Sequence, residues 1–141
     1  MEIQKEGGPK MEIEKIAREN FERWAKALLT KDPGVVAVFY ADDCTFLPTM
    51  SPELLIGPEE ARGYFEHFLM KSPEGEVRKE KIAPMGELFY KHTGMYDFEI
   101  ENKDAGRSVV EARFTFIWRK ESDETWKIFH HHSSEKPKKG K

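Results

Sequence analysis

"RSVVEARFTFIWRKESDETWKIFHHHSS" spans residues 107–134 and contains the pattern that decides the fold. Two runs rich in β-branched and aromatic residues flank the turn-rich segment at 121–125, which is typical of two antiparallel strands joined by a short connection. Successive side chains of a strand point to opposite faces. Phe114, Phe116 and Trp118 therefore share one face, and Arg113 lies on the other. We expect the aromatic face to line a concavity.

The second of these runs contains three consecutive histidines, which cannot share one face of a strand. If the strand is regular, His131 and Ser133 point into the concavity, whereas Ile128, His130 and His132 point outward. A β-bulge would exchange the two faces. The run is too short, and too well embedded in a β pattern, to be a purification tag.

Helical patterns precede the strands. Apolar residues recur at three- and four-residue steps over 12–30, a short apolar segment at 34–43 reads as a second helix, and a third begins at Pro58. A short strand is expected at 44–50, and after Gly75 only strand patterns remain, over 76–85 and 86–102. Helices first and strands after predict an α+β fold, with helices on one face of a curved antiparallel sheet and a pocket between them.

The length of 141 residues fits one domain, which we place at 12–135 between a flexible lead-in (1–11) and a basic tail (136–141). Twenty-three basic and 26 acidic residues give a net charge of −3, which offers no general attraction to nucleic acid. The absence of a long apolar run argues against a membrane partner, and the N-terminus lacks the apolar region of a secretory signal. These features indicate a cytoplasmic protein.

Four stretches together resemble the nuclear transport factor 2-like superfamily, and within it the association (hub) domain of calcium/calmodulin-dependent protein kinase II and its stand-alone relatives. They are "FYADDCTFLPTMSPE" (39–53), "GPEEARGYFEHFL" (57–69), "ARFTFIW" (112–118) and "WKIFHHHSSEKP" (126–137). The resemblance implies a cone-like fold in which a strongly curved sheet wraps the long N-terminal helix, accompanied by two shorter helices. It also implies a deep pocket. The kinase hub assembles as dimers stacked into rings, and other superfamily members are isomerases, dehydratases and cyclases.

The basic residues of the kinase hub's pocket carry over only in part. Arg78 matches one of them, whereas Phe98, Phe116 and Ser133 occupy positions where the hub has arginines. A pocket that is less positive and more aromatic follows. The residues expected to line it are Tyr64, Arg78, Tyr96, Phe116, His131 and Ser133.

The first functional hypothesis is a homo-oligomerising association domain that binds a small polar or aromatic ligand. Its partner is itself, as a dimer or a larger ring, and the mixed outer sheet face with Arg113, His130 and His132 is the expected interface. No kinase motif is present in the chain. No cofactor is expected.

The second hypothesis is a cofactor-independent isomerase, dehydratase or cyclase. A histidine that acts as general acid or base needs a carboxylate to orient it, and His131 with Asp42 or Asp43 is the candidate pair. A metal site would need a third ligand beside His130 and His132, such as His92, and we assign none.

Overall fold

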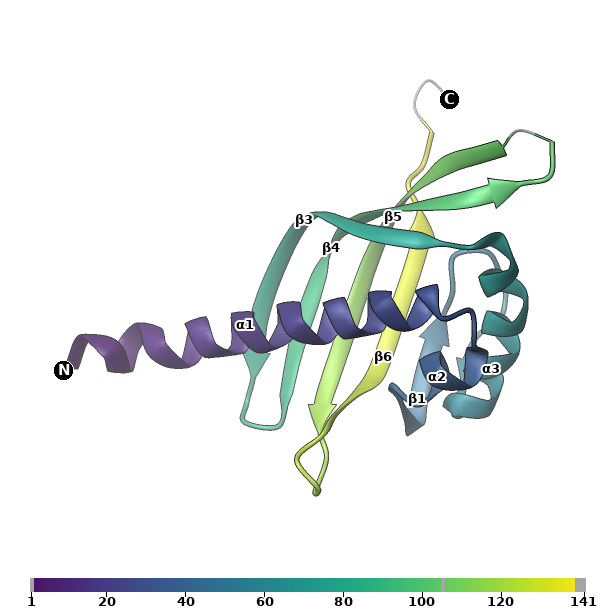
Figure 1. Cartoon of the computed structure of the whole chain (residues 1–141). Helices are drawn as coiled ribbons and strands as arrows, with labels where there is room; N and C mark the ends of the chain where they lie inside the picture. The colour runs from purple at the N-terminus through teal and green to yellow at the C-terminus, as the bar shows by residue number, and fades with distance from the viewer. Residues whose placement is uncertain (1, 105, 139–141) are drawn as a thin grey trace.

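The computed structural model describes residues 2–104 and 106–138, with side chains from residue 11 onward. A long helix lies across a six-stranded sheet, and two shorter helices stand at one end of it (Figure 1). The elements in chain order are α1 (Glu2–Leu29), α2 (Pro33–Ala37), β1 (Tyr40–Leu47), β2 (Leu55–Ile56), α3 (Gly57–Phe68), the 3-10 turn η1 (Leu69–Lys71), β3 (Glu74–Met85), β4 (Phe89–Asn102), β5 (Gly106–Lys120) and β6 (Trp126–Glu135).

The sheet has the strand order β2-β1-β6-β5-β4-β3 and is not closed into a barrel. Strands β3 to β6 form a continuous antiparallel meander, as the sequence pattern predicts. The sheet is nevertheless mixed, because β1 pairs with β6 in parallel. The two strands come from opposite ends of the chain, so no hairpin dictates their relative direction. The α+β class and the cone-like arrangement are confirmed, with this correction to the antiparallel sheet.

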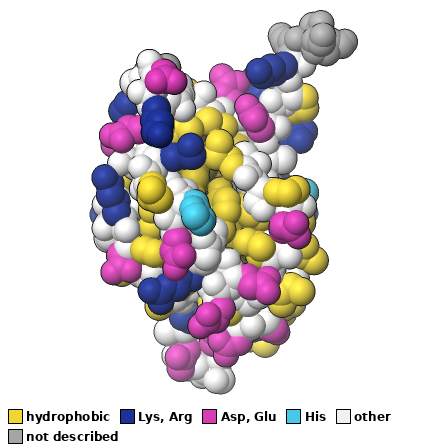
Figure 2. All heavy atoms as spheres, turned by 90° about the vertical axis from the view of Figure 1, so that its right-hand side faces the viewer, with side chains coloured by type: hydrophobic (Ala, Val, Ile, Leu, Met, Phe, Trp, Pro, Cys, Tyr) yellow, Lys and Arg dark blue, Asp and Glu magenta, His cyan; other side chains and the backbone are white. Residues whose placement is uncertain are grey.

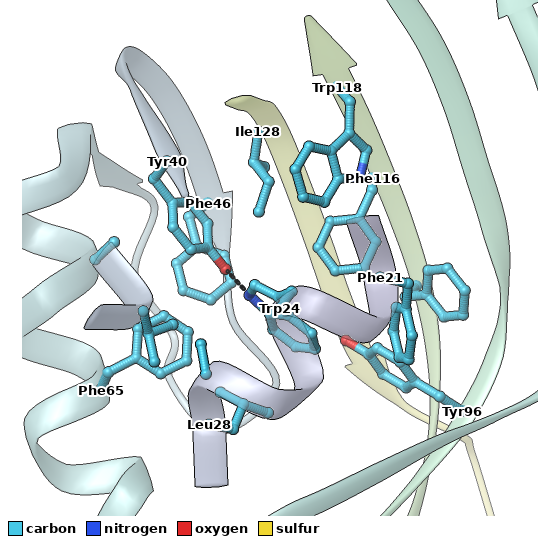
Figure 3. Packing of buried hydrophobic residues seen from close by; sticks show 14 of the residues in the cluster. Phe21, Trp24, Leu28, Tyr40, Phe46, Phe65, Tyr96, Phe116, Trp118 and Ile128 are labelled. Carbon is cyan, nitrogen blue, oxygen red and sulfur yellow. Dashed lines mark hydrogen bonds between the residues drawn. The ribbon is translucent and has the colours of Figure 1, made fainter. Parts of the chain in front are cut away.

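Helix α1 buries the predicted apolar stripe against the concave face of the sheet. Ala17, Trp24 and Leu28 are at most 1% exposed. The Trp24 indole meets the Phe116 ring edge to face, with ring centroids 5.2 Å apart. Phe114, Phe116 and Trp118 of β5 are likewise buried, so the aromatic face predicted from their alternation forms the core (Figure 3).

Two element boundaries differ from those predicted. Helix α1 begins at Glu2 instead of residue 12, so it includes most of the stretch expected to be a flexible lead-in (1–11). Residue 1 lies outside the described part. Adding a turn to an existing helix avoids the cost of nucleation. The short helix α2 ends at Ala37, and 40–43 belong to β1 because Tyr40 pairs with Ile128 of β6. Strand β6 ends at Glu135, directly before the expected tail. The first residue of the tail still contacts the sheet, because the Lys136 backbone N–H donates to the Glu111 carbonyl; residues 139–141 lie outside the described part.

Candidate functional site

A small cavity lies between the end of α1, helix α3 and the concave face of the sheet. Its volume is about 20 Å³, which is room for about one water molecule. Aromatic rings from different elements enclose it, among them Phe46, Phe65, Tyr96 and Phe98. The cavity is therefore a narrow, mostly apolar throat.

Polar atoms are concentrated on one wall of this throat, around the fully buried His131 of β6. The Tyr40 hydroxyl lies 3.0 Å from His131 Nδ1, and the Tyr96 hydroxyl lies 3.2 Å from Nε2. The Tyr96 hydroxyl also donates to Ser133 Oγ at 2.6 Å, and Ser133 in turn hydrogen-bonds Thr49. Phe46 and Phe116 stack on the two sides of the imidazole, with centroids 4.7 and 4.0 Å away. Both nitrogens of His131 are thus satisfied inside the protein.

Burial keeps each of these titratable groups uncharged. It lowers the pKa of His131 well below its ordinary value, and the nearby His130 and His132 act in the same direction. Burial also raises the pKa of Tyr64 and Tyr96, which favours their neutral hydroxyl forms. None of the described side chains that line the throat is Lys or Arg. At neutral pH the throat is polar on one wall and carries no charge.

The throat opens toward a wider groove on the outer side of α3. This groove has a volume of about 500 Å³, and it shares Met50, Tyr64 and Phe68 with the throat. Figure 2 shows apolar side chains gathered in a hollow on this side of the molecule. Met50 is 48% exposed at the junction, so a flexible side chain separates the groove from the buried polar wall.

The structure brings four of the six predicted pocket residues to the throat, namely Tyr64, Tyr96, His131 and Ser133. Phe116 lies behind His131 and does not line the space. Phe98, one of the aromatic replacements for a hub arginine, does line it.

Arg78 is misplaced in the sequence-based prediction. Its Nε donates to Asp97 Oδ2 at 2.7 Å on the exposed surface, away from the throat. The reason is a β-bulge: Val77 pairs with Tyr96 and Lys79 with Met95, which leaves Arg78 as the extra residue. A bulge reverses the alternation of side chains on either side of it.

The predicted catalytic pair is not assembled. Asp42 and Asp43 are exposed on β1, and no described carboxylate is a hydrogen-bond partner of His131. Asp43 instead makes two hydrogen bonds with Arg119, at 2.9 and 3.1 Å, and the guanidinium lowers the pKa of this carboxyl. Both acids were placed at the end of a helix, whereas β1 turns them outward.

A β-bulge also interrupts the histidine strand. Ile117 pairs with His130 but Trp118 pairs with Ile128, so Phe129 is the extra residue. Ile128 and His131 are consequently both buried, although three positions separate them. The prediction that Ile128 points outward is wrong because the bulge lies between it and the histidines.

The three residues expected at an interface all lie on the outer sheet face. His132 and Arg113 are exposed, and Arg113 donates to Ser134 Oγ. His130 is half-buried, with Nδ1 2.7 Å from Thr45 Oγ1. Partial burial lowers the pKa of His130, and the neighbouring His132 adds to the effect.

A second buried histidine, His92, is paired with a carboxylate that the sequence pattern did not indicate. His92 of β4 lies 2.8 Å from Glu80 Oε1 through Nε2, and Arg18 of α1 contacts the other oxygen of the same carboxylate at 2.8 Å. Partial burial of Glu80 opposes its ionisation, but the bonds from Arg18 and His92 outweigh that effect and lower its pKa. The strand register that sets Glu80 beside His92 was the missing information. The trio ties α1 to the sheet and does not touch the throat.

No group of three or more His, Cys, Asp or Glu side chains converges anywhere in the described ranges, 2–104 and 106–138. His92, the third ligand considered for a metal site, faces inward on β4, whereas His132 faces outward on β6. Among the helices of these ranges, none has the length and apolar character needed to cross a bilayer.

Comparison with known structures first defines the class of protein. A structure named as a dehydratase of the nuclear transport factor 2-like family from Streptomyces avermitilis superposes with a TM-score of 0.75 at 15% identity, covering 92% of this chain and 99% of that one. The association domain of the Caenorhabditis elegans calcium/calmodulin-dependent kinase II gives 0.71 at 17% identity, over 91% and 98%. At these identities the likeness concerns the fold alone, which is nuclear transport factor 2-like.

The family is more specific. The model of the calcium/calmodulin dependent protein kinase II association domain matches residues 11–137. A structure named for such a domain from Xanthomonas campestris shares 36% identity, with a TM-score of 0.83 and 86% of each chain covered. No curated protein matches the chain. The chain belongs to the calcium/calmodulin-dependent protein kinase II association domain family.

Proposed function

We propose that this protein is a homo-oligomerising association domain, forming a dimer or a larger ring, whose pocket binds a small polar or aromatic ligand. The observation that carries the assembly proposal is the outer face of the sheet. The described helices pack on the concave face and leave the outer face uncovered within the chain (Figure 1).

The composition of this outer face suits burial against another subunit. Val109 is 53% exposed, and Ile117 and Phe129 are half-buried on the same face. Arg113 and His132 supply polar contacts beside them. Interfaces combine apolar side chains with arginine and aromatic residues in this way, whereas the solvated face of a sheet is mainly polar.

The throat and groove support the ligand part of the proposal. A largely apolar space with a few convergent polar groups is the usual form of a small-molecule site. The polar wall around His131 and Ser133 is buried, and the wider groove provides access to it.

Native mass spectrometry of the purified chain, with mass photometry at nanomolar concentration, tests the assembly. We expect a dimer or a larger closed oligomer at micromolar concentration. Ile117→Arg places a charge on the outer face and should shift the population toward smaller species. Val35→Arg is the matched control, because Val35 is 39% exposed on α2, away from the sheet. A monomeric wild-type chain at micromolar concentration would refute the proposal.

The alternative function is cofactor-independent acid–base catalysis as an isomerase, dehydratase or cyclase. The fold neighbour named as a dehydratase favours it. His131 would then act without a carboxylate, since its described partners are the Tyr40 and Tyr96 hydroxyls. A general base needs a pKa near the working pH, and burial moves that of His131 away from it. The association domain is therefore the better supported function.

A further inference from the structure

The polar wall of the throat is a single chain of hydrogen bonds with a fixed direction. It begins at Trp24, whose indole Nε1–H donates to the Tyr40 hydroxyl at 3.2 Å (Figure 3). An indole nitrogen donates and never accepts. The Tyr40 oxygen is thus an acceptor in this bond, and its single proton is free for the next group, His131 Nδ1 at 3.0 Å.

The remaining protons follow from the same count. Because Nδ1 of His131 accepts from Tyr40, the neutral ring carries its proton on Nε2, which donates to the Tyr96 oxygen. The Tyr96 proton goes to Ser133 Oγ at 2.6 Å. Ser133 then has one proton left, and its other described partner is Thr49. Each group donates to the next, from the indole to Ser133, and the chain continues to Thr49 through the Ser133–Thr49 hydrogen bond.

The chain ends at Thr49, which sits in the turn after β1 and lines the throat. Thr49 and Ser133 share one hydrogen bond in which either hydroxyl can be the donor, so one hydroxyl proton of this pair has no partner in the described part of the protein. The aligned O–H and N–H dipoles all present their positive ends toward this pair, and aligned hydrogen bonds polarise one another. The outermost group of the polar wall is therefore a donor.

We infer that the pocket selects an uncharged ligand with an apolar body and one hydrogen-bond acceptor, such as a ketone carbonyl, which receives the Thr49 proton. This inference rests on the proposed pocket function and names its ligand class. The apolar body occupies the groove at Met50, Tyr64 and Phe68, and the acceptor reaches into the throat.

A carboxylate fits this wall poorly. Neutral hydroxyl donors do not replace the hydration of a full charge, and no described lining side chain of the throat is cationic. His131 does not supply the charge either. A second proton on Nδ1 would make both ring nitrogens donors, and Tyr40 would then face two donors with no described acceptor for its own proton.

The test uses three single-ring probes of similar size: acetophenone, α-methylstyrene, in which a methylene group replaces the carbonyl oxygen, and benzoate. Each is titrated into the ¹⁵N-labelled full chain and followed by amide chemical shifts. One neutral hydrogen bond is worth about 2- to 10-fold in affinity. We expect acetophenone to bind more tightly than α-methylstyrene by such a factor, and benzoate to bind most weakly.

Thr49→Val removes the donor at nearly constant shape and should abolish the preference for acetophenone, while Thr49→Ser should retain it. Thr45→Val is the matched control, because the Thr45 hydroxyl pairs with His130 on the outer face. Equal binding of acetophenone and α-methylstyrene, or tighter binding of benzoate, overturns the inference and leaves the pocket intact. If none of the probes shifts residues of the throat or groove, the pocket function itself fails, and the inference fails with it.

A second measurement tests the direction of the chain without any ligand. The side-chain ¹⁵N shifts of His131 report which nitrogen carries the proton. We expect the proton on Nε2 in the wild-type chain and in Thr49→Val. A proton on Nδ1 overturns the inference, because the chain would then run in the opposite direction at this ring.

Discussion

Trp24 occupies the centre of the core, and Trp24→Ala is the substitution whose cost follows most directly from the structure. The side chain is 1% exposed and lies against Phe98, Phe116 and His131, with centroids 5.2 to 6.3 Å away. A buried tryptophan removes about 150–250 Å² from water, which corresponds to roughly 4–6 kcal/mol at about 25 cal/mol per Å². The alanine retains part of that area.

Loss of the indole also removes the hydrogen bond to Tyr40, which costs about 1 kcal/mol of stability. The cost is no larger because the Tyr40 hydroxyl keeps His131 as a partner. Large aromatic truncations in cores cost about 3–5 kcal/mol, since surrounding atoms relax only partly. We therefore expect the free energy of unfolding to fall by about 3–5 kcal/mol. Urea titration monitored by circular dichroism measures it, at two protein concentrations because the proposed assembly would couple to stability.

Trp126→Ala is the matched control. Trp126 is half-buried at the start of β6 and lies 5.0 Å from the Tyr90 ring, so the same substitution should cost about 1–2 kcal/mol. A loss below about 1 kcal/mol for Trp24→Ala, or a loss no larger than that of Trp126→Ala, would mean that the face of α1 is misassigned.

Gly94→Ala should lower the free energy of unfolding by more than about 2 kcal/mol, because a Cβ there overlaps the backbone carbonyl of Lys79. On α3, a Cβ at Gly63 meets no atom within 4 Å, so Gly63→Ala should be neutral or stabilising by up to about 1 kcal/mol. Thermal unfolding of the two variants checks this, and equal effects would contradict it. Replacing His130 and His132 together with glutamine should alter assembly and spare ligand binding, and His131→Gln should do the reverse, as native mass spectrometry and probe titration would report. The pKa of His130 is already lowered in the folded chain, so protonation below about pH 6.5 opposes the native state, and assembly should weaken as the pH falls. If assembly changes neither between pH 8 and pH 5 nor on the double substitution, these histidines are only solvated. Asp43→Asn removes an exposed ion pair with Arg119 and should change stability by about 1 kcal/mol or less without affecting probe binding. A large loss of binding would restore Asp43 as a candidate catalytic residue.

The alternation of side chains was enough to predict which face of β5 forms the core. Phe114, Phe116 and Trp118 recur at every second position, and no bulge interrupts them, so the periodicity survives folding. His131 and Ser133 lie on the concave face although the strand is not regular, because the bulge at Phe129 precedes them and does not exchange their faces.

The failures share one physical cause. Whether an extra residue enters a strand depends on the register that the neighbouring strand imposes, and a single sequence contains no local mark of that register. Ile128 was misplaced for this reason. Arg78, which the resemblance to the hub assigned to the pocket, is the extra residue of a bulge and lies on the exposed surface. The parallel pairing of β1 with β6, which turns Asp43 outward, likewise depends on contacts between segments about 85 residues apart, such as that of Thr45 with His130.

The bulge at Arg78 also bears on how copies of this chain can meet. Strand β3 is the last strand of an open sheet, and an unpaired strand edge is a template for joining the sheet of another molecule. Here the extra residue interrupts the regular run of backbone donors and acceptors, and Pro84 lacks an N–H altogether. Lys79 and Lys81 add charge along the same stretch. Growth of a continuous sheet from one molecule to the next through this edge is thereby discouraged, and the proposed closed assembly would form by face-to-face contact instead.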